Sequence, residues 1–199
     1  MQIQIIFAGT RNKACANNSI NFLKPCHRLD RNTSGIVLFA KNEEALNILL
    51  QAFKNKEIEK HYRCIVYNIP KNKRANLKSY LFKDTKKSIV YISDIPKKGY
   101  KEILTSYTVI SENKKENLAY LDVELHTGRT HQIRAHLAHI GSPILGDGKY
   151  GINEINKKHS CTYQKLVSYS ITFHFSNNNV LNYLNDITFK LHDTPFSVF

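Results

Sequence analysis

Hydrophobic positions along the chain follow two different periods. A compact apolar run over 35–40 is typical of a buried strand. Just after it, Asn42 can cap a helix, and apolar side chains recur at helical spacing as far as Phe53, which predicts an amphipathic helix over 43–54. From position 61 the period changes to two, which indicates a series of strands over 61–67, 76–82, 88–92, 102–110 and 118–126.

The pattern near the two ends completes a mixed order of elements. Imperfect alternation predicts a short strand over 3–7, and the polar stretch over 9–21 is interpreted as a loop. A second helix is expected over 130–139, closed by Gly141, with further strands over 165–175 and 187–191. Many short strands with two helices favour an α+β fold on a mainly antiparallel sheet over a doubly wound α/β fold.

The charge of the chain narrows the class of partner. The 199 residues carry 29 Lys and Arg against 16 Asp and Glu, a formal net charge of +13. Such an excess favours a polyanion such as RNA, DNA or an acidic membrane surface, and a merely solvated basic surface is the plainer alternative. Hydrophobic residues make up 42% of the chain, which is ordinary for a globular protein of one domain.

Targeting and redox signals indicate the cytoplasm. No apolar stretch approaches the roughly 18 residues of a membrane helix, and the N-terminus has no signal-peptide core. The four cysteines form no C-x-x-C pair, so reduced thiols are the simplest expectation. We therefore expect a cytoplasmic protein with one domain over 1–199, a monomer without membrane contact.

Residues 27–35, His-Arg-Leu-Asp-Arg-Asn-Thr-Ser-Gly, form a polar segment directly before the buried strand. Asp30 lies between Arg28 and Arg31, and two cations so near favour its ionised form. An ionised carboxylate is a poor general acid at neutral pH, but it can serve as a nucleophile or a base. The plainer interpretation is an Asx-type turn with an exposed ion pair.

A second segment places an aromatic side chain among basic ones at the start of the strand over 61–67. Tyr62 can stack on a base, with Lys60 and Arg63 as candidate phosphate contacts. A strand-edge tyrosine that packs on its neighbour is the commoner alternative.

A third segment, 125–137, leaves a strand, turns at Gly128 and enters the second predicted helix. Gln132 and Arg134 lie near the helix N-terminus, where the dipole favours anions. Histidines at 131, 136 and 139 invite a metal site, but the five-residue interval turns the first imidazole away from the second. Because no carboxylate lies at zincin spacing either, no metal is expected, and an amphipathic helix with a basic face is the plain alternative.

The segment over 27–41, which continues as Ile-Val-Leu-Phe-Ala-Lys, closely resembles the catalytic motif of the RNA pseudouridine synthases. It is most similar to the RluA-type branch, which acts on large-subunit ribosomal RNA or on tRNA. Residues 60–66 resemble the second motif of this family, and Gly-Arg-Thr-His-Gln-Ile-Arg over 128–134 resembles the third. With the loop over 141–151 and a looser match over 163–175, the resemblance covers 26 to about 175.

The resemblance implies a fold and a reaction. The fold is the pseudouridine synthase catalytic fold, a mixed, mainly antiparallel sheet flanked by helices and loops. The reaction isomerises specific uridines in ribosomal RNA or tRNA after base flipping, by cleavage of the N1–C1′ bond and formation of a C5–C1′ bond. It requires neither a cofactor nor a metal.

The resemblance also implies roles for individual residues. Asp30 is the expected catalytic aspartate, Tyr62 packs against the target base, and Arg134 pairs with the aspartate. The expected substrate-binding residues are Arg28, Arg129, His131 and Gln132 on the RNA-facing wall and Leu166 under the target base. Asp147 and Tyr150, in the loop over 141–151, are expected to support the site.

The chain departs from the family pattern at both ends of the resemblance. Residues 1–25 are shorter than the usual N-terminal segment, with no room for an S4-like module, and Lys24-Pro25 is not equivalent in position to the usual Lys-Pro-x-Gly loop. In the terminal strand, Val167 and Ser168 replace the usual His-Ala.

Two other functions stay open. One is a catalytically silent RNA-binding or ribosome-assembly factor, which the complete set of Asp30, Tyr62 and Arg134 disfavours. The other is a membrane-surface or general polyanion-binding protein. That function requires a strongly basic amphipathic helix, and neither predicted helix has one.

Overall fold

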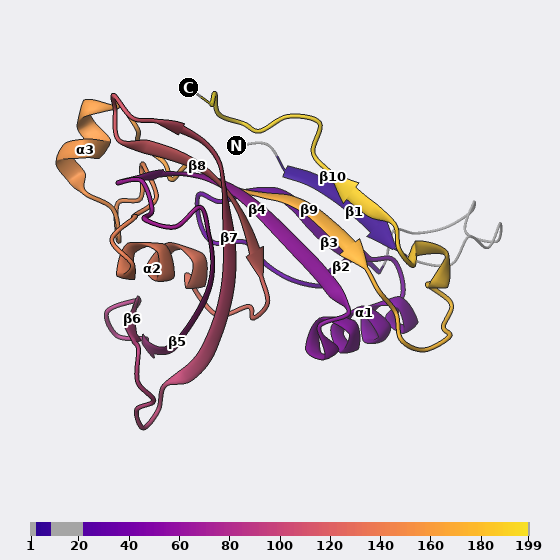
Figure 1. The fold of residues 1–199 in the computed structure, drawn as a ribbon. Coiled ribbons are helices and arrows are strands. Elements are labelled where there is room, and N and C mark those ends of the chain that lie inside the picture. The colour runs from indigo at the N-terminus through magenta and orange to yellow at the C-terminus, as the bar shows by residue number, and fades with distance from the viewer. Residues whose placement is uncertain (1–2, 9–21, 199) are drawn as a thin grey trace.

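The computed structural model describes residues 3–8 and 22–198, so the predicted loop over 9–21 lies outside the described residues (Figure 1). The helices and strands, in chain order, are β1 (Ile3–Ala8), β2 (Lys24–Pro25), β3 (Ser34–Ala40), α1 (Glu43–Asn55), β4 (Ile58–Tyr67), β5 (Arg74–Asp84), β6 (Ile89–Ser93), β7 (Lys101–Asn113), β8 (Leu118–Leu125), α2 (Gln132–His139), α3 (Asn153–Lys158), β9 (Leu166–Phe173) and β10 (Thr188–Lys190). No helix of this part of the chain is long and apolar enough to cross a membrane.

All ten strands belong to one sheet, which confirms the predicted α+β fold. Its main path runs β1-β3-β9-β4-β8-β7-β5-β6, with β2 paired to β3 and β10 to β9. The pairs of β3 with β1 and with β9 are parallel, and the other pairs are antiparallel. The long strand β4 lies at the centre between β8 and β9, which gives the second motif a fixed place in the middle of the sheet.

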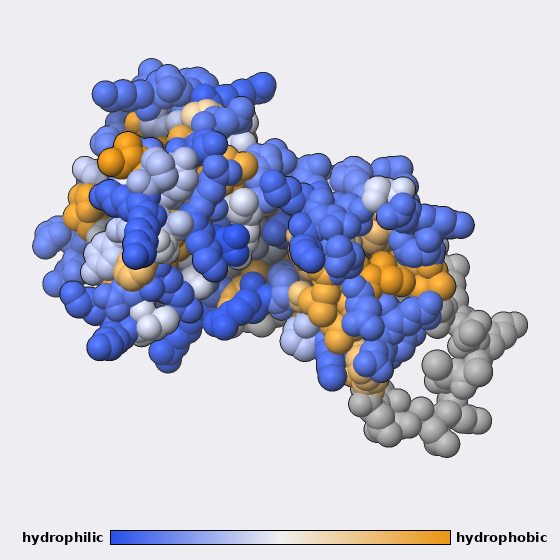
Figure 2. Space-filling model, turned by 90° about the horizontal axis from the view of Figure 1, so that it is seen from below, coloured by the Kyte–Doolittle hydropathy of each residue, from blue (hydrophilic) through white to orange (hydrophobic). Residues whose placement is uncertain are grey.

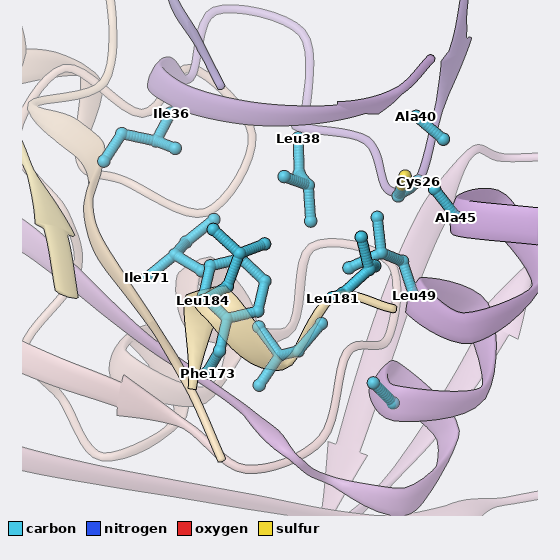
Figure 3. Packing of buried hydrophobic residues seen from close by; sticks show 12 residues of the cluster. Cys26, Ile36, Leu38, Ala40, Ala45, Leu49, Ile171, Phe173, Leu181 and Leu184 are labelled. Carbon is cyan, nitrogen blue, oxygen red and sulfur yellow. The ribbon is translucent and has the colours of Figure 1, made fainter. Parts of the chain in front are cut away.

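Two hydrophobic cores hold the helices on this sheet. Helix α1 buries Ala45 and Leu49 against Leu38 of β3, together with Phe173 and Leu181 from the C-terminal part of the chain (Figure 3). A second core packs side chains of α2, β4, β8 and β9 together: Ile133, Leu137, Tyr62, Cys64, Val66, Leu121, Val123 and Leu166. In Figure 1 the curled part of the sheet, β7-β5-β6, wraps around α2, while α1 packs against β3. The first core contains Ile36 of the first motif, and the second core contains Tyr62 of the second motif and Ile133 of the third.

The ends of α1 agree with the sequence prediction. The Asn42 side-chain oxygen accepts a hydrogen bond from the Ala45 amide at 2.8 Å, as expected of an N-cap. At the other end Lys56 adopts a left-handed conformation, with φ of 62°, that stops the helix.

The start of α2 differs from the prediction. The helix begins at Gln132, two residues later than the sequence pattern suggested, because His131 adopts a left-handed conformation with φ of 52°. Such a conformation is uncommon for a residue other than glycine and cannot continue an α-helix.

The sequence pattern did not predict two short elements, because neither is long enough to show a hydrophobic period. Strand β2 has two residues, and α3 is a six-residue polar helix. A tertiary contact holds α3: the buried Asn156 side chain accepts from the Gly146 amide at 2.7 Å and donates to the Asp147 carbonyl at 3.1 Å.

Candidate active site

Asp30 lies in a tight turn directly before β3, close to the start of β9. The backbone amide of Thr33 donates to the Asp30 carbonyl at 3.0 Å. The buried Thr33 hydroxyl accepts from the side-chain amide of Gln164 at 2.6 Å. Gly35 follows with φ of 113°, and a Cβ atom there would lie 2.2 Å from the Ser168 carbonyl oxygen. The glycine of the first motif thus allows the backbone contact that sets the Asp30 turn against β9.

Arg134 connects Asp30 with a second carboxylate, that of Asp147. Its Nε and one terminal nitrogen donate to the two Asp147 oxygens at 2.7 and 2.9 Å, and its other terminal nitrogen lies 3.4 Å from Asp30 Oδ2. The Arg134 side chain is 8% exposed, that of Asp147 is fully buried, and that of Asp30 is 23% exposed. The structure therefore brings Asp30 and Arg134 together, but the firm bidentate partner of the arginine is Asp147.

Asp147 is held in its ionised form by several donors. Its carboxylate accepts from the amides of Lys149 and Tyr150 at 2.8 and 3.1 Å, besides its bonds to Arg134. Burial alone would raise the pKa of Asp147, but the Arg134 guanidinium and these amides keep the pKa below its usual value. Because the fixed Asp147 carboxylate occupies Nε and one terminal nitrogen of Arg134, the other terminal nitrogen is left for the contact with Asp30.

Tyr62 and Leu166 form the apolar wall beside Asp30. Both side chains are buried, at 7% and 3% exposure, and both line the cleft that contains Asp30. Burial above all, together with the nearby Asp30 carboxylate, raises the pKa of Tyr62 to about 12. The Tyr62 hydroxyl therefore carries its proton at neutral pH.

Gln132 borders the cleft, but its side chain forms hydrogen bonds with other residues of the protein. The amide oxygen accepts from the Thr127 hydroxyl at 2.9 Å and from the Arg129 amide at 3.1 Å. The amide nitrogen donates to the Leu104 carbonyl and to the Thr105 hydroxyl, both at 3.0 Å. All donors and acceptors of Gln132 are thus engaged, so this residue fixes the loop before α2 to β7.

Arg28, Arg129 and His131 line the same cleft. The two arginines are exposed, and neither has a carboxylate partner within the described part of the chain. His131 is half-buried, and its Nδ1 lies 2.9 Å from the Tyr150 hydroxyl.

The expectation that Arg63 contacts RNA phosphates beside Tyr62 is wrong. Successive residues of a strand point to opposite faces, so Arg63 lies on the face of β4 away from Tyr62. There its Nε lies 3.0 Å from Asp122 Oδ2, and its guanidinium lies 4.7 Å from the centre of the Tyr169 ring. The period-two alternation of this strand in the sequence already indicated that Arg63 and Tyr62 lie on opposite faces.

The cleft around these residues has a volume of about 750 Å³ and is rich in positive charge. Its cations come from all three motifs, and three more come from the end of α1 and from β5: Lys54, Lys56 and Lys83. Three carboxylates, of Asp30, Glu59 and Glu124, lie among them. Seen from below, the molecule is hollowed between the half that carries α1 and the half that carries α2, and hydrophilic side chains border the hollow (Figure 2).

Two further basic groups of the cleft are perturbed by burial. Burial lowers the pKa of Lys60, whose ammonium lies 5.4 Å from the centre of the Phe53 ring. Burial also lowers the pKa of His27 to about 4, and the Nε2 of this histidine accepts from the Leu38 amide at 3.1 Å. His27 is therefore neutral and holds the turn to β3, whereas Lys60 lines the cleft with its amino group beside Phe53.

The two histidines of α2 lie apart from the cleft. The Nδ1 of the buried His136 lies 3.0 Å from the Thr105 hydroxyl, and His139 Nε2 lies 2.8 Å from Asp94. Within residues 3–8 and 22–198, no group of three or more His, Cys, Asp and Glu side chains could hold a metal ion.

Comparison with known proteins gives a consistent result. The sequence model of a family described as RNA pseudouridylate synthase matches residues 8–139. An uncharacterized RNA pseudouridine synthase of Chlorobaculum parvum is 43% identical over 130 residues, which are 63% of this chain and 38% of that protein. Ribosomal large subunit pseudouridine synthase C of Buchnera aphidicola is 35% identical over 135 residues, 68% of this chain and 42% of that protein. The chain thus spans less than half the length of these relatives.

A solved structure shares the fold. Human RNA pseudouridylate synthase domain containing 1 superposes with a TM-score of 0.68 at 22% identity, over 78% of this chain and 66% of the human chain. At this level of identity the likeness concerns the arrangement of the strands and helices.

Proposed function

The chain belongs to the RNA pseudouridylate synthase family, and from this premise we propose that it isomerises uridine in RNA to pseudouridine, with Asp30 as its catalytic residue. One observation supports this most. Asp30 and Arg134 are 104 positions apart in the sequence, yet they meet at 3.4 Å in a cleft that Tyr62 also lines. The residues of all three motifs therefore converge, and the ten strands of one sheet support a single catalytic domain.

The proposed reaction rearranges one nucleotide without net loss or gain of atoms. The N1–C1′ bond breaks, the uracil turns, and a C5–C1′ bond forms, while C5 loses a proton and N1 gains one. Because the reacting atoms are unreachable inside a stacked helix, the uridine is flipped into the cleft at a cost of a few kcal/mol. The size of the cleft, about 750 Å³, is compatible with one nucleotide and its neighbours.

Asp30 acts on the ribose or on the base of the flipped nucleotide, either as a nucleophile or as a base. Arg134 contacts the Asp30 carboxylate from one side, and Asp147 holds the guanidinium in place. Tyr62 and Leu166 provide the apolar surface against which the uracil lies. The protonated Tyr62 hydroxyl can donate a hydrogen bond to the substrate.

The proposed partner is ribosomal RNA of the large subunit or tRNA. The cations of the cleft suit phosphate groups, and a second hollow of about 880 Å³ shares Lys56, Glu124 and His126 with the cleft. This second hollow lies over β5, β7 and β8 and adds Arg74 and Lys78. Phosphate contacts along such a surface offset part of the cost of flipping. The similarity to ribosomal large subunit pseudouridine synthase C of Buchnera aphidicola favours the ribosomal substrate.

The test is pseudouridine mapping of total RNA from cells with and without the gene, followed by reaction of the purified protein with the unmodified RNA. The wild-type protein is expected to restore the missing site, and Asp30→Asn is expected to bind the RNA without modifying it. Asp186→Asn, at an exposed carboxylate near the C-terminal strand, is the matched control and retains activity. Full activity of Asp30→Asn would contradict the catalytic role. Binding without modification by the wild type would instead indicate a silent RNA-binding factor.

A further inference from the structure

A hydrogen-bond chain next to the Asp30–Arg134 pair joins Tyr150, expected above only to support the site, to His131 of the expected RNA-facing wall. The amide of Val90, in β6, donates to the Tyr150 hydroxyl oxygen at 2.9 Å. The same oxygen lies 2.9 Å from Nδ1 of His131, the residue directly before α2. The chain therefore links a strand on the far side of α2 to a side chain that lines the cleft.

The direction of this chain follows from its first member. A backbone amide can only donate, so the Tyr150 oxygen accepts from Val90. The hydroxyl has one proton of its own, and His131 Nδ1 is its only acceptor among the described residues. If Nδ1 carried a proton instead, the Tyr150 hydroxyl would accept twice and its own proton would have no acceptor. Nδ1 is therefore the acceptor, and a neutral His131 carries its proton on Nε2.

The surroundings of His131 favour the neutral ring. Burial lowers the pKa of His131 below its usual value. The charges of Arg134 and Lys149 act in the same direction, whereas those of Asp30 and Asp147 oppose it. Arg28 and Arg129 line the same cleft as His131.

The packing fixes where the Nε2 edge points. The Tyr150 ring meets the His131 ring edge-on, with centroids 5.6 Å apart, and the Arg134 guanidinium lies 5.3 Å from the centre of the Tyr150 ring. Asp147 accepts from the Tyr150 amide and binds Arg134, so this ring cannot move independently of the site. His131 lines the cleft, Nδ1 of its half-buried imidazole is taken by Tyr150, and Nε2 has no hydrogen-bond partner in the described part of the chain. We infer that this free nitrogen is the one available to a molecule in the cleft.

We propose that Tyr150 is a positioning residue that holds His131 as a neutral imidazole with its proton on Nε2, and that His131 donates this N–H to an oxygen of the bound nucleotide. In this tautomer Nε2 cannot accept a proton, so His131 is a donor and not a base. The acceptor is a uracil carbonyl or a ribose or phosphate oxygen. A neutral donor adds a hydrogen bond beside Asp30 without placing a second full cation next to the Asp30–Arg134 pair. The second half of this inference, the contact with the nucleotide, rests on the proposed function.

The first experiment reads the tautomer in the free protein by long-range ¹H–¹⁵N correlation of the histidine side chains at pH 7, with His131→Gln to assign the signal. The wild-type His131 is expected to be neutral with its proton on Nε2. Tyr150→Phe keeps the ring under Arg134 and removes only the hydroxyl, so the share of the Nε2–H tautomer is expected to fall to that of an unconstrained neutral imidazole. Tyr163→Phe, at a side chain that is 64% exposed, is the matched control.

A proton on Nδ1 of the wild type, an imidazolium at pH 7, or an unchanged tautomer in Tyr150→Phe would each overturn the proposal. This readout needs neither RNA nor activity, so its failure is distinct from failure of the proposed function.

The second experiment tests the donor by comparing variants at position 131. His131→Gln retains a side-chain N–H, whereas His131→Leu has none. The glutamine variant is expected to keep at least tenfold more kcat/KM than the leucine variant in pseudouridine formation. Equal kcat/KM for the two variants would contradict the donor role even if both fold and bind RNA.

Discussion

Arg134 depends on Asp147 at least as much as on Asp30. Two short bonds join it to the fully buried Asp147 carboxylate, and one longer contact joins it to Asp30. The sequence resemblance pointed to the pair with Asp30 and gave Asp147 a general supporting role. A buried cation that loses its counter-charge is strongly destabilised, which makes the Asp147 carboxylate the more vulnerable side of this network.

We expect Asp147→Asn to lower the free energy of unfolding by about 3–5 kcal/mol, because the substitution removes the bidentate anion of the buried Arg134 and leaves it only the longer contact to Asp30. Urea unfolding measures this loss. Asp193→Asn, at a side chain that is 83% exposed, should stay within about 0.5 kcal/mol of the wild type. A stability of Asp147→Asn equal to that of the control would show that the buried pair contributes little.

The raised pKa of His61 makes the stability of the fold depend on pH. Its two ring nitrogens lie 2.5 Å from Asp122 Oδ1 and 2.7 Å from Glu59 Oε1, and these carboxylates, Asp122 above all, raise the pKa of His61 from 6.5 to about 9. Because the pKa is raised by folding, the stabilisation is fully present below the unfolded pKa of 6.5 and is lost as the pH rises through 9.

The urea midpoint of the wild type should therefore fall between pH 6.5 and 10 more steeply than that of His61→Gln. Parallel curves for the two proteins over this interval would show that the imidazolium does not stabilise the fold.

The contact between β3 and β9 decides where the Asp30 turn lies. These strands pair only at two positions, Ser34 with Val167 and Gly35 with Ser168. The first motif is thereby anchored beside Leu166 at the start of β9. A local pattern predicts both strands, but the place where they touch depends on the absence of a side chain at Gly35.

We expect Gly35→Ala to destabilise the protein by at least about 2 kcal/mol, since the new Cβ meets the Ser168 backbone and the φ of 113° is strained for alanine. Gly148→Ala is the matched control, because a Cβ there has no atom within 4 Å. Thermal unfolding of both variants measures the difference. Equal melting temperatures of the two variants would mean that β3 and β9 can move apart at Gly35 without loss of stability.

Most elements were predictable because they have a clear period. The helix over 43–54 and the central strands alternate or repeat clearly, and the structure places them within a few residues of the predicted bounds. The later start of α2 and the short α3 depend on single residues in special environments. His131 adopts positive φ there, and Asn156 bonds to a distant loop, so no local period reports either of them.

At the scale of the whole molecule, positive charge is concentrated where the motifs converge. The net charge of +13 alone did not say which surface meets a polyanion. The fold brings lysines from the end of α1 and from β5 to the same cleft as Arg28 and Arg129.

RNA affinity should therefore fall steeply with salt, because bound phosphates release counterions. Arg129→Gln is expected to reduce the slope of log Kd against log salt by about 0.7–0.9, the value of one phosphate contact. Lys115→Gln removes an equal charge from an exposed turn outside the cleft and should leave the slope unchanged. Filter binding at several salt concentrations distinguishes them, and equal slopes for both variants would place Arg129 away from the bound RNA.

The sequence by itself determined the α+β class, most of the elements and the chemistry of three motifs, because period, turn residues and side-chain types are local properties. Only the tertiary structure decided which side chains act on one another. It turned Arg63 to the far face of β4, gave Arg134 its main partner in Asp147, and placed the Tyr150 hydroxyl between Val90 and His131. These contacts depend on strand register and on chain segments far apart in sequence, and a local pattern carries no information about either.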